Sequence, residues 1–392
     1  MRILLASNLF PPDVLGGYEL LASDVAHALR SRGHDVHVLT TGERRSDDPI
    51  WVHRTLRLVR SFDKPASLDR LRHALVARDQ EVATADVLTL GFDAAVVMSM
   101  RRLGLHVPRA LQRAGIPTVY CFNDDWFLAH RPGEAKTAAR RAMWTALEKV
   151  ALGARTWRGV HVERAVYVSA AIRAALRDGG APLPDGTVCF QGVDRAVFHA
   201  RPERGVPAAP KLLYAGRVHP TKGVDVAIEA LGALRRDGVA ATLSVVGTGA
   251  KEELDRLARI AAEQGVTRAV DFRGFVPRAE LGDVYREHDI FLFPSLWEEP
   301  AGLTYLEAMA CGVPVAAIAR GGAKELLRHE ENALVAFDAA TLAAAVHRMT
   351  NESELVARIV RGGETTVREH ASLERYVGAI EDELTRAARN AA

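Results

Sequence analysis

Residues 211–246 have the sequence KLLYAGRVHPTKGVDVAIEALGALRRDGVAATLSVV, and this stretch decides the fold class. An apolar run at Lys211–Ala215 is followed, after a glycine-containing loop, by a helical pattern at Val224–Arg236. A second apolar run comes at Ala241–Val246. A strand, a helix and a strand in this order predict a βαβ unit, in which the two strands lie parallel in one sheet.

The same alternation continues on both sides of this stretch. Toward the amino terminus, a helix is expected at Glu19–Ser31 and strands at Ile3–Ala6, Val36–Thr40, Ala94–Met98, Thr118–Phe122 and Ala165–Val168. Toward the carboxyl terminus, strands at Ala269–Phe272, Ile290–Pro294 and Val313–Ile318 alternate with helices at Lys251–Gln264, Ala279–Glu287 and Leu303–Ala310. A chain of 392 residues exceeds the usual size of one domain, so the pattern predicts two doubly wound, Rossmann-like α/β domains.

The boundary between the domains is marked by composition. The sequence RPERGVPAAP at 201–210 holds three prolines in ten residues and no periodicity, which is typical of a linker. We therefore expect an N-terminal domain at 1–200 and a C-terminal domain at 211–373, with a helix at about 374–392 that packs back on the first domain. Such sheets bind ligands at the carboxyl ends of their strands, and two that face each other leave a cleft for a two-part ligand.

The composition of the chain limits the classes of partner and the cellular compartment that we expect. A net charge of +2 with 26% charged residues argues against a nucleic-acid partner, which usually needs a concentrated basic face. The three cysteines are far apart in the sequence, so they indicate neither a disulfide framework nor a zinc site. The amino terminus lacks the features of a signal peptide, and no apolar run reaches the ~18 residues of a membrane span. The expected location is the cytoplasm.

One segment could contact an anionic membrane surface. Residues Arg131–Arg158 hold seven Arg or Lys against two Glu, with Trp144 and Trp157 among them. Weak binding to a membrane or to an acidic acceptor would fit this composition. A solvated helical face is the simpler interpretation of the same pattern.

The strongest motif in the chain is SLWEEPAGLTYLEAMACGVPV, at 295–315. It places Glu299 in the loop after an expected strand and Glu307 about one turn into the following helix. Carboxylates accept hydrogen bonds from paired sugar hydroxyls, and the backbone N–H groups at the helix start suit an anion or a hydroxyl. The alternative is two surface glutamates near a helix start, where the helix dipole favours them.

A second motif, YAGRVHPTKG at 214–223, follows the first strand of the C-terminal domain. Arg217 and Lys222 at the carboxyl end of that strand suit a diphosphate, because a guanidinium binds it as a fork and an ammonium as a point charge. The alternative is two solvated cations in a loop.

Three weaker patterns follow other strands. Gly16-Gly17 lies between the first strand and its helix, where two glycines let a substrate approach the backbone. Gly247-Thr248-Gly249 lacks the third glycine of the dinucleotide fingerprint, so it is weak support for a nicotinamide cofactor. Asp124-Asp125 follow another strand, but one pair of carboxylates is thin support for a metal.

Together these motifs resemble the retaining glycosyltransferase family 4, also described as glycosyl transferases group 1, which has the GT-B fold. The resemblance rests on motifs in the order of the family: Gly16-Gly17, Gly216–Gly223, Val245–Gly249, Phe272–Gly274, Glu299–Glu307 and Gly321–Glu325. It covers nearly the whole chain and is best in the carboxyl-terminal half. It implies a nucleotide diphosphate sugar as a substrate, an acceptor that the motifs do not name, and neither a cofactor nor a divalent metal.

The resemblance also implies roles for individual residues. Arg217 and Lys222 would hold the diphosphate and stabilise the departing nucleotide, Glu307 would bind the ribose, and Glu299 would lie beside the transferred sugar. The catalytic residues implied are Arg217, Lys222, Glu299 and Asn123. The donor-binding residues implied are Gly16, Gly17, Gly216, Arg217, Lys222, Gly247, Phe275, Val276, Glu299, Ala301, Gly302, Leu303 and Glu307. Asp124 and His130 would contact the acceptor.

Asn123 departs from the family pattern, because many relatives have a His followed by an Asp at the end of this strand. An Asn can still hydrogen-bond a sugar, but it cannot exchange a proton near neutral pH. Two alternatives remain open at this point: an epimerase of sugar nucleotides with the same architecture, and a nucleotide-sugar binder without catalysis. The oligomeric state is left open as well.

Overall fold

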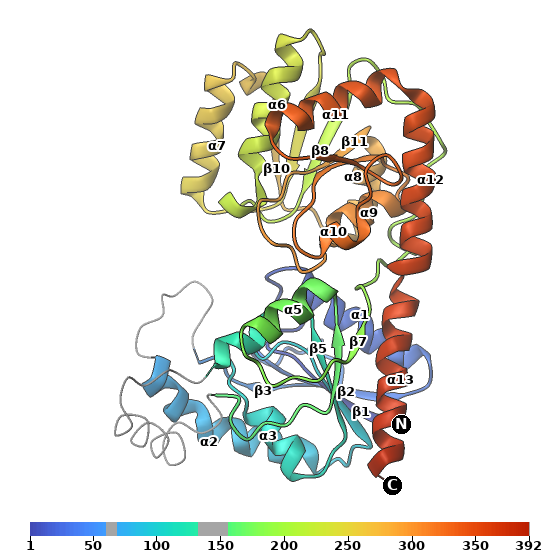
Figure 1. Cartoon of the computed structure of the whole chain (residues 1–392). Helices are drawn as coiled ribbons and strands as arrows, with labels where there is room; N and C mark the ends of the chain where they lie inside the picture. Colours follow the sequence, from blue (N-terminus) through green and yellow to red (C-terminus); the bar gives the residue numbers. More distant parts are fainter. Residues whose placement is uncertain (60–68, 132–155, 392) are drawn as a thin grey trace. The chain divides into compact units, whose positions relative to one another are not determined.

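A computed structural model describes residues 1–59, 69–131 and 156–391 of the chain. The chain forms two compact units. Unit 1 comprises Met1–Cys189 and Tyr376–Ala392, and unit 2 comprises Phe190–Arg375. The segment 201–210, expected to be a linker, groups with unit 2, and the last helix groups with unit 1 from Tyr376 onward (Figure 1).

Unit 1 contains a parallel sheet with the strand order β3-β2-β1-β4-β5-β6-β7 in the described part of the chain. Its strands are β1 (Arg2–Ala6), β2 (Asp35–Thr41), β3 (Val52–Leu56), β4 (Ala94–Val97), β5 (Thr118–Phe122), β6 (Arg164–Tyr167) and β7 (Thr187–Val188). The helices that the structure describes are α1 (Gly17–Ser31), α2 (Asp69–Leu88), α3 (His106–Arg113), α5 (Ala170–Asp178) and α13 (Leu373–Ala391), with a 3-10 turn η1 (Trp126–His130).

Unit 2 contains a second parallel sheet, with the order β10-β9-β8-β11-β12-β13. Its strands are β8 (Lys211–Ala215), β9 (Thr242–Val246), β10 (Val270–Gly274), β11 (Ile290–Phe293), β12 (Val315–Ile318) and β13 (Leu334–Ala336). Its helices are α6 (Val224–Arg236), α7 (Lys251–Glu263), α8 (Arg278–Glu287), α9 (Thr304–Ala310), α10 (Ala323–Leu326), α11 (Ala339–Asn351) and α12 (Ser353–His370), with 3-10 turns η3 (Pro220–Lys222) and η4 (Thr267–Ala269).

Both faces of β8, a central strand of the unit 2 sheet, are buried. On β8, Leu212 and Tyr214 belong to the core formed with α6, α7 and α11, whereas Leu213 and Ala215 belong to the core formed with α8 and α9. Successive side chains of a strand point to opposite faces, so a strand covered on both sides is apolar at every position. This is the reason that the strands appear in the sequence as continuous apolar runs.

The prediction of two doubly wound α/β domains is confirmed. Three of the predicted elements, Thr118–Phe122, Lys211–Ala215 and Val224–Arg236, coincide with β5, β8 and α6. The expected strand at Val313–Ile318 begins later, at Val315, because Pro314 has no N–H to donate to a neighbouring strand.

In both sheets the strand order reverses at one point. The first strand of unit 1, β1, lies between β2 and β4, and the first strand of unit 2, β8, lies between β9 and β11. The connections that leave such a pair run to opposite sides, so a crevice opens at the carboxyl ends of the strands. In unit 2, the loops at this point are those that follow β8 and β11.

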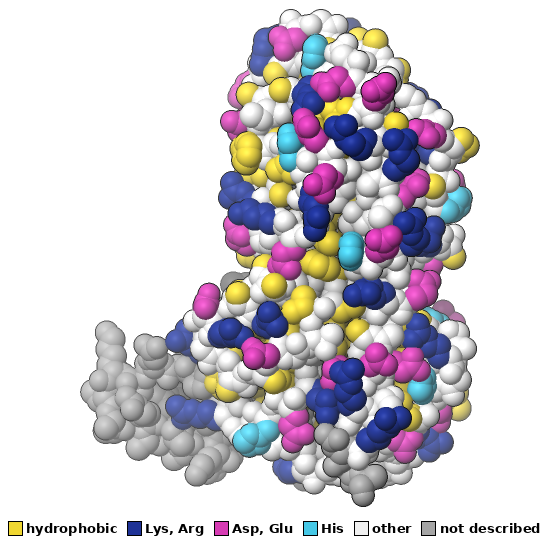
Figure 2. All heavy atoms as spheres, turned by 45° about the vertical axis from the view of Figure 1, so that its right-hand side comes forward, with side chains coloured by type: hydrophobic (Ala, Val, Ile, Leu, Met, Phe, Trp, Pro, Cys, Tyr) yellow, Lys and Arg dark blue, Asp and Glu magenta, His cyan; other side chains and the backbone are white. Residues whose placement is uncertain are grey.

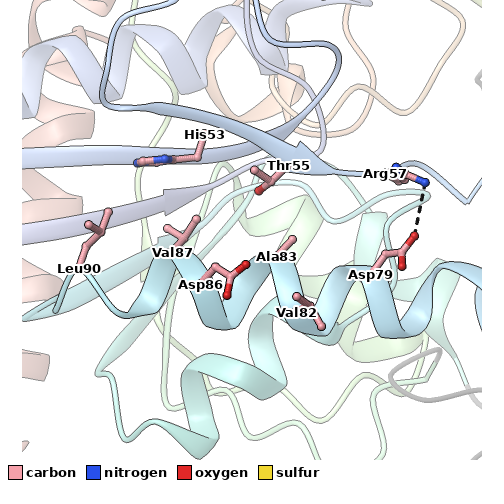
Figure 3. A pocket seen from close by; sticks show the side chains of 9 residues that line it. All are labelled: His53, Thr55, Arg57, Asp79, Val82, Ala83, Asp86, Val87 and Leu90. Atoms are coloured by element: carbon pink, nitrogen blue, oxygen red, sulfur yellow. Dashed lines mark hydrogen bonds and ion pairs between the residues drawn. The ribbon is translucent and has the colours of Figure 1, made fainter.

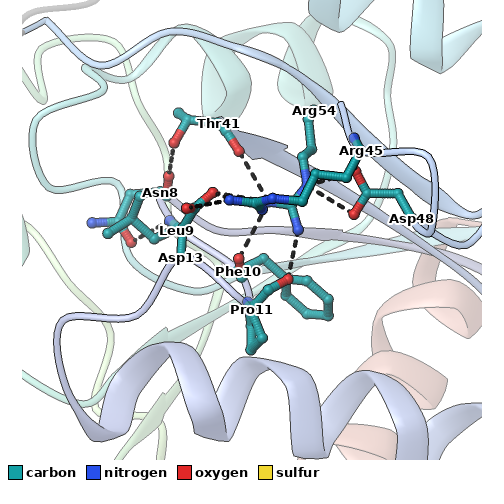
Figure 4. A network of polar contacts seen from close by, with 9 residues as sticks. All are labelled: Asn8, Leu9, Phe10, Pro11, Asp13, Thr41, Arg45, Asp48 and Arg54. Carbon is teal, nitrogen blue, oxygen red and sulfur yellow. Dashed lines mark hydrogen bonds and ion pairs between the residues drawn. The ribbon is translucent and has the colours of Figure 1, made fainter. Parts of the chain in front are cut away.

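A buried cation holds the corresponding loop of unit 1 (Figure 4). The Arg54 guanidinium on β3 is fully buried and donates to Asp48 at 2.9 Å. It also donates to the carbonyl oxygens of Phe10 at 3.2 Å and Pro11 at 2.5 Å, which belong to the loop after β1. Asp13 in the same loop lies 3.4 Å from the guanidinium. This charge therefore fixes the chain between β1 and α1.

Arg54→Ala is expected to lower the free energy of unfolding by about 3–5 kcal/mol, because it leaves the buried Asp48 carboxylate without its partner. Arg57→Ala is the matched control, since Arg57 is 72% exposed and pairs with an exposed Asp79 at 3.4 Å. An exposed pair contributes only about 0–1 kcal/mol. Chemical denaturation of both variants is the measurement. Equal losses would contradict the role assigned to Arg54.

Candidate functional site

In unit 2, the loops after β8 and β11 are joined directly. The N–H of Leu296 donates to the carbonyl oxygen of Thr221 at 2.9 Å. Beside this bond, Gly223 has φ +69° and is the N-cap residue that precedes α6. A Cβ at this position would lie 2.0 Å from the carbonyl oxygen of Pro294. Only glycine allows both this backbone conformation and this approach. The contact brings the residue before Gly223, which is Lys222, against the second loop.

Lys222 and Glu299 form an ion pair between the two loops. The Lys222 Nζ lies 2.6 Å from the Glu299 Oε1, and the Ser295 hydroxyl donates to the same oxygen at 2.6 Å. The Glu299 side chain is 7% exposed and that of Lys222 is 23% exposed. A carboxylate removed from water to this degree needs a cation and hydrogen bonds to stay charged. Lys222 supplies the cation and Ser295 one of the hydrogen bonds.

The loop after β12 holds the backbone of the same glutamate. The N–H of Gly322 donates to the carbonyl oxygen of Glu299 at 2.6 Å. Gly321, which the sequence analysis noted without a role, has φ +56°, and a Cβ there would lie 2.4 Å from the same carbonyl oxygen, so this position requires glycine. Glu299 is thus fixed through its carboxylate and through its carbonyl group.

Arg217 lies in the first loop with its side chain exposed. The Tyr214 hydroxyl donates to its carbonyl oxygen at 2.8 Å, so the backbone of the loop is held. Within the described residues the guanidinium makes no ion pair. Because Glu299 compensates Lys222, Arg217 supplies the uncompensated positive charge of this loop. A guanidinium in this setting suits a phosphate group.

Gly216 and Gly247 bring the ends of β8 and β9 together. The N–H of Gly216 donates to Val246 at 2.9 Å, and the N–H of Gly247 donates to Gly274 at 2.8 Å. With φ +136° at Gly247, a Cβ there would lie 1.8 Å from the carbonyl oxygen of Gly216. Gly247 therefore allows a close approach of the two backbones, and its contact with the donor stays a prediction.

Glu307 lies in α9, after the loop that carries Glu299. The Tyr285 hydroxyl of α8 donates to its Oε2 at 2.8 Å. Burial raises the pKa of Tyr285 well above its ordinary value, and the neighbouring Glu307 adds to this shift. The phenol therefore keeps its proton and remains a donor.

The other residues of unit 2 that we expected to bind the donor differ in how deeply they are buried. The Phe275 side chain, in the loop after β10, is 74% exposed, and Val276 packs partly against the core. Ala301 is fully buried, whereas Gly302 and Leu303 are partly buried. The Phe275 ring is thus exposed to solvent, whereas Ala301 has only backbone groups to offer.

In unit 1, Gly16 and Gly17 stand at the start of α1. The Glu19 carboxylate accepts hydrogen bonds from the N–H of Gly16 at 2.9 Å and of Leu15 at 3.3 Å. Glu19 is buried, and burial raises the pKa of its carboxyl group. The N–H of Gly16 is thus already used inside the protein. The sequence analysis missed Glu19, although an acid three residues after a cap position is a known helix signal.

Asn123 follows β5 and is nearly buried. Its side-chain oxygen accepts a hydrogen bond from the Tyr376 hydroxyl of α13 at 2.8 Å. Its backbone N–H lies 3.4 Å from the Tyr18 hydroxyl, which itself donates to Cys121 at 2.6 Å. Tyr376 of the carboxyl-terminal helix thus orients the Asn123 side chain, which stands where many relatives have a His.

The two expected acceptor-binding residues differ in their surroundings. Asp124 accepts a hydrogen bond from the N–H of Trp126 at 2.7 Å and lies 3.4 Å from Arg101. Burial raises the pKa of Asp124, and Arg101 opposes this shift. His130 is buried, with its Nε2 3.3 Å from the carbonyl oxygen of Met100. The Asp124 side chain is therefore largely buried, with 29% of its surface exposed, and the His130 ring lies in the interior.

Potential metal ligands are sparse in the described part of the chain, which contains no cluster of three or more His, Cys, Asp or Glu side chains able to hold an ion. Asp125, considered above as a metal ligand, forms an ion pair with Arg101 at 2.6 Å. Arg101 therefore forms ion pairs with both carboxylates that follow β5.

A separate groove of about 520 Å³ lies between β3 and α2 (Figure 3). It is lined by His53, Thr55, Arg57, Asp79, Val82, Ala83, Asp86, Val87 and Leu90. None of the site residues expected from the sequence lines this groove. The candidate site is therefore the pair of loops in unit 2.

The distribution of surface charge and the apolar length of the helices bear on whether the protein binds nucleic acid or a membrane. On the face drawn in Figure 2, basic and acidic side chains are interspersed without a large patch of one sign. Within the described residues, no helix is both long enough and apolar enough to span a bilayer. Most of the basic segment Arg131–Arg158 lies outside the described residues.

Comparisons with known proteins identify the family. The profile "Glycosyl transferases group 1" matches residues 200–366, and the profile "Glycosyltransferase Family 4" matches residues 15–197. A glycogen synthase of Mycobacterium tuberculosis is 30% identical over 384 residues, which cover 92% of this chain and 89% of that protein. The chain belongs to glycosyltransferase family 4. This family 4 chain is also 30% identical to a D-inositol 3-phosphate glycosyltransferase of Acidothermus cellulolyticus, over 88% of this chain and 80% of that protein.

Solved structures show that this glycosyltransferase has the GT-B fold. HepE of Anabaena, in complex with UDP and glucose, has a TM-score of 0.71 at 18% identity and covers 98% of this chain and 100% of its own. Sucrose-phosphate synthase of Thermosynechococcus elongatus has a TM-score of 0.72 at 20% identity, with 100% of both chains covered. At these identities the likeness concerns the fold.

Gly223→Ala is expected to lower the free energy of unfolding of unit 2 by about 2–5 kcal/mol. The left-handed backbone accounts for about 1–2 kcal/mol, and the overlap with Pro294 for the rest. Gly238→Ala is the matched control, because Gly238 has φ +84° but a Cβ added there would meet nothing within 4 Å. Denaturant unfolding compares the two variants. If both lose the same free energy, the contact with Pro294 is not a constraint.

Proposed function

We propose that this glycosyltransferase takes its sugar from a nucleoside diphosphate sugar and transfers it with retention of configuration. The observation that carries the proposal is the geometry of unit 2, where Arg217 and the Lys222–Glu299 pair follow β8 and β11 at the point where the strand order reverses. Two cations suit a diphosphate, and carboxylates suit sugar hydroxyls. HepE, a neighbour in fold, was crystallised with UDP-glucose, which supports the same class of donor.

In the proposed reaction, the bond between the anomeric carbon and the β-phosphate oxygen breaks. The acceptor oxygen forms a new bond to the same face of the anomeric carbon, and the acceptor proton passes to the departing phosphate. Arg217 and Lys222 would stabilise the negative charge that develops on that phosphate. Electrostatic stabilisation of this kind is usually the largest single contribution to the rate enhancement of an enzyme. These two cations would serve in place of a divalent metal.

The chemistry of two other residues supports a reaction without an enzyme nucleophile. The Glu299 Oε1 already accepts hydrogen bonds from Lys222 and Ser295, which lowers its reactivity as a nucleophile. Asn123 cannot act as an acid or a base near neutral pH. Its proposed role is a hydrogen bond to the sugar.

A donor screen tests this function. Release of nucleoside diphosphate is followed for UDP-, GDP-, ADP- and TDP-sugars with a range of acceptors, with and without EDTA. Transfer with at least one donor is expected, and it should survive EDTA. A sugar nucleotide that is converted to another sugar nucleotide without an acceptor would indicate an epimerase, and saturable binding without turnover would indicate a binder without catalysis.

Arg217→Ala and Lys222→Ala are each expected to lower kcat about 10²-fold or more, the scale seen when one donor to a developing oxyanion is removed. The control is Lys251→Ala, because Lys251 lies on α7 with its side chain 81% exposed and pairs only locally with Asp255. Steady-state kinetics with the donor found in the screen is the measurement. Turnover near that of the unchanged enzyme in both site variants would refute the roles of these cations.

A further inference from the structure

Tyr305 of α9 carries a hydroxyl group that has no hydrogen-bond partner in the described part of the chain. The side chain is fully buried, and its ring packs edge-on against Phe293, the last residue of β11, with ring centroids 5.0 Å apart. A buried hydroxyl without a partner costs free energy, because it has lost its hydrogen bonds to water. Such a group calls for a partner that it meets in another state of the protein.

The hydroxyl lies close to carboxylates of the candidate site. A Cβ added at Gly302 would lie 2.7 Å from Cε1 of the Tyr305 ring, so the loop that carries Glu299 passes over the hydroxyl end of this ring. Burial raises the pKa of Tyr305 well above its ordinary value, and the nearby Glu299 and Glu325 carboxylates add to this shift. The phenol therefore keeps its proton and can donate it in a hydrogen bond to a carboxylate.

Glu299 can accept such a bond. Within the described residues, the two donors to its carboxylate, Lys222 and Ser295, both use Oε1 at 2.6 Å. A carboxylate offers about four acceptor positions on its two oxygens, so Oε2 is able to accept another donor. The Glu299 side chain is 7% exposed, and without the Lys222 cation it would be a buried negative charge held by Ser295 alone.

We propose that Tyr305 is a positioning residue for Glu299 in the complex with the donor. The inference rests on the proposed function, in which Lys222 binds the diphosphate. When the phosphates draw the Lys222 ammonium away from Glu299, the Tyr305 hydroxyl takes its place as a donor to the carboxylate. Glu299 then stays charged and in place, and the hydroxyl gains the partner that it lacks in the ligand-free protein.

The exchange offsets a cost of binding the donor. A diphosphate brings negative charge toward a carboxylate that has just lost its cation, and like charges repel strongly where water is scarce. A hydrogen bond to an ionised group is roughly twice as strong as one between neutral groups. Tyr214 of β8 is a second phenol near Glu299, but its hydroxyl already donates to the carbonyl oxygen of Arg217 at 2.8 Å. Tyr305 is therefore the donor that is available for the exchange.

Calorimetry on the full chain with UDP, GDP and ADP, combined with denaturant unfolding without ligand, tests the proposal. Tyr305→Phe removes only the hydroxyl. The midpoint of unfolding is expected to stay the same or to rise, because the ligand-free protein loses no hydrogen bond. The affinity for the nucleotide that binds is expected to fall about 10- to 100-fold, the scale of one hydrogen bond to a charged group.

Tyr167→Phe is the matched control for a buried tyrosine hydroxyl. Tyr167 is buried in unit 1, and its hydroxyl donates to the carbonyl oxygen of Pro184 at 2.6 Å in the ligand-free protein. The opposite pattern is therefore expected, with a lower midpoint of unfolding and an unchanged affinity for the nucleotide.

The Lys222→Ala background tests the exchange without any ligand. In this variant Glu299 has no cation, so the Tyr305 hydroxyl is expected to be its donor already in the free protein. Adding Tyr305→Phe to this background should lower the midpoint of unfolding, whereas the same change leaves the midpoint of the otherwise unchanged protein the same or raises it. A difference of this kind measures the coupling between the two residues.

The outcomes separate this inference from the function on which it rests. If UDP, GDP and ADP do not bind and no donor is turned over, the proposed function fails and the inference fails with it. If a nucleotide binds equally well to Tyr305→Phe, or if this change has the same effect on unfolding in both backgrounds, only the exchange is overturned. A Tyr305→Phe protein that does not fold, or that loses stability and affinity together, would also overturn it, because the hydroxyl would then have a partner before the donor binds.

Discussion

The approach of the Gly223 backbone to Pro294 is the constraint on which the site in unit 2 depends. It occurs where the strand order reverses, between β8 and β11, and it is closed by the bond from Leu296 to Thr221. Because this contact holds the two loops together, Lys222 reaches Glu299 at 2.6 Å. The parallel sheet sets where the loops begin, and the glycine sets how close they come.

Buried hydroxyl groups then orient the polar side chains of the site. Ser295 donates to Glu299 at 2.6 Å, and Tyr285 donates to Glu307 at 2.8 Å. In unit 1, the Tyr376 hydroxyl does the same for Asn123 at 2.8 Å. Each donor is a side chain of the protein itself, so its partner is already oriented before a ligand binds. Preorganisation of this kind lowers the free-energy cost of forming the reactive arrangement.

Unit 1 reaches a similar result with a charge. The loop after β1 carries carbonyl groups that converge on the buried Arg54, and Asp48 balances its charge at 2.9 Å. A loop without regular structure of its own is thereby fixed at the start of α1. The two units thus use different interactions, a backbone contact and a buried ion pair, to hold the loops at the point where their strand order reverses.

The sequence by itself determined the architecture and the positions of the loops, because the periods of strands and helices and the glycines of the turns are local patterns. Those patterns failed at β3, where His53 and Arg54 interrupt the apolar run of a strand that the structure buries. Only the tertiary structure decided which side chains meet. Lys222 and Glu299 are 77 residues apart in the chain, and Asn123 and Tyr376 are 253 residues apart, so no local pattern could pair them. Burial is likewise a property of the packed chain, so the sequence did not indicate that the ring of His130 is buried.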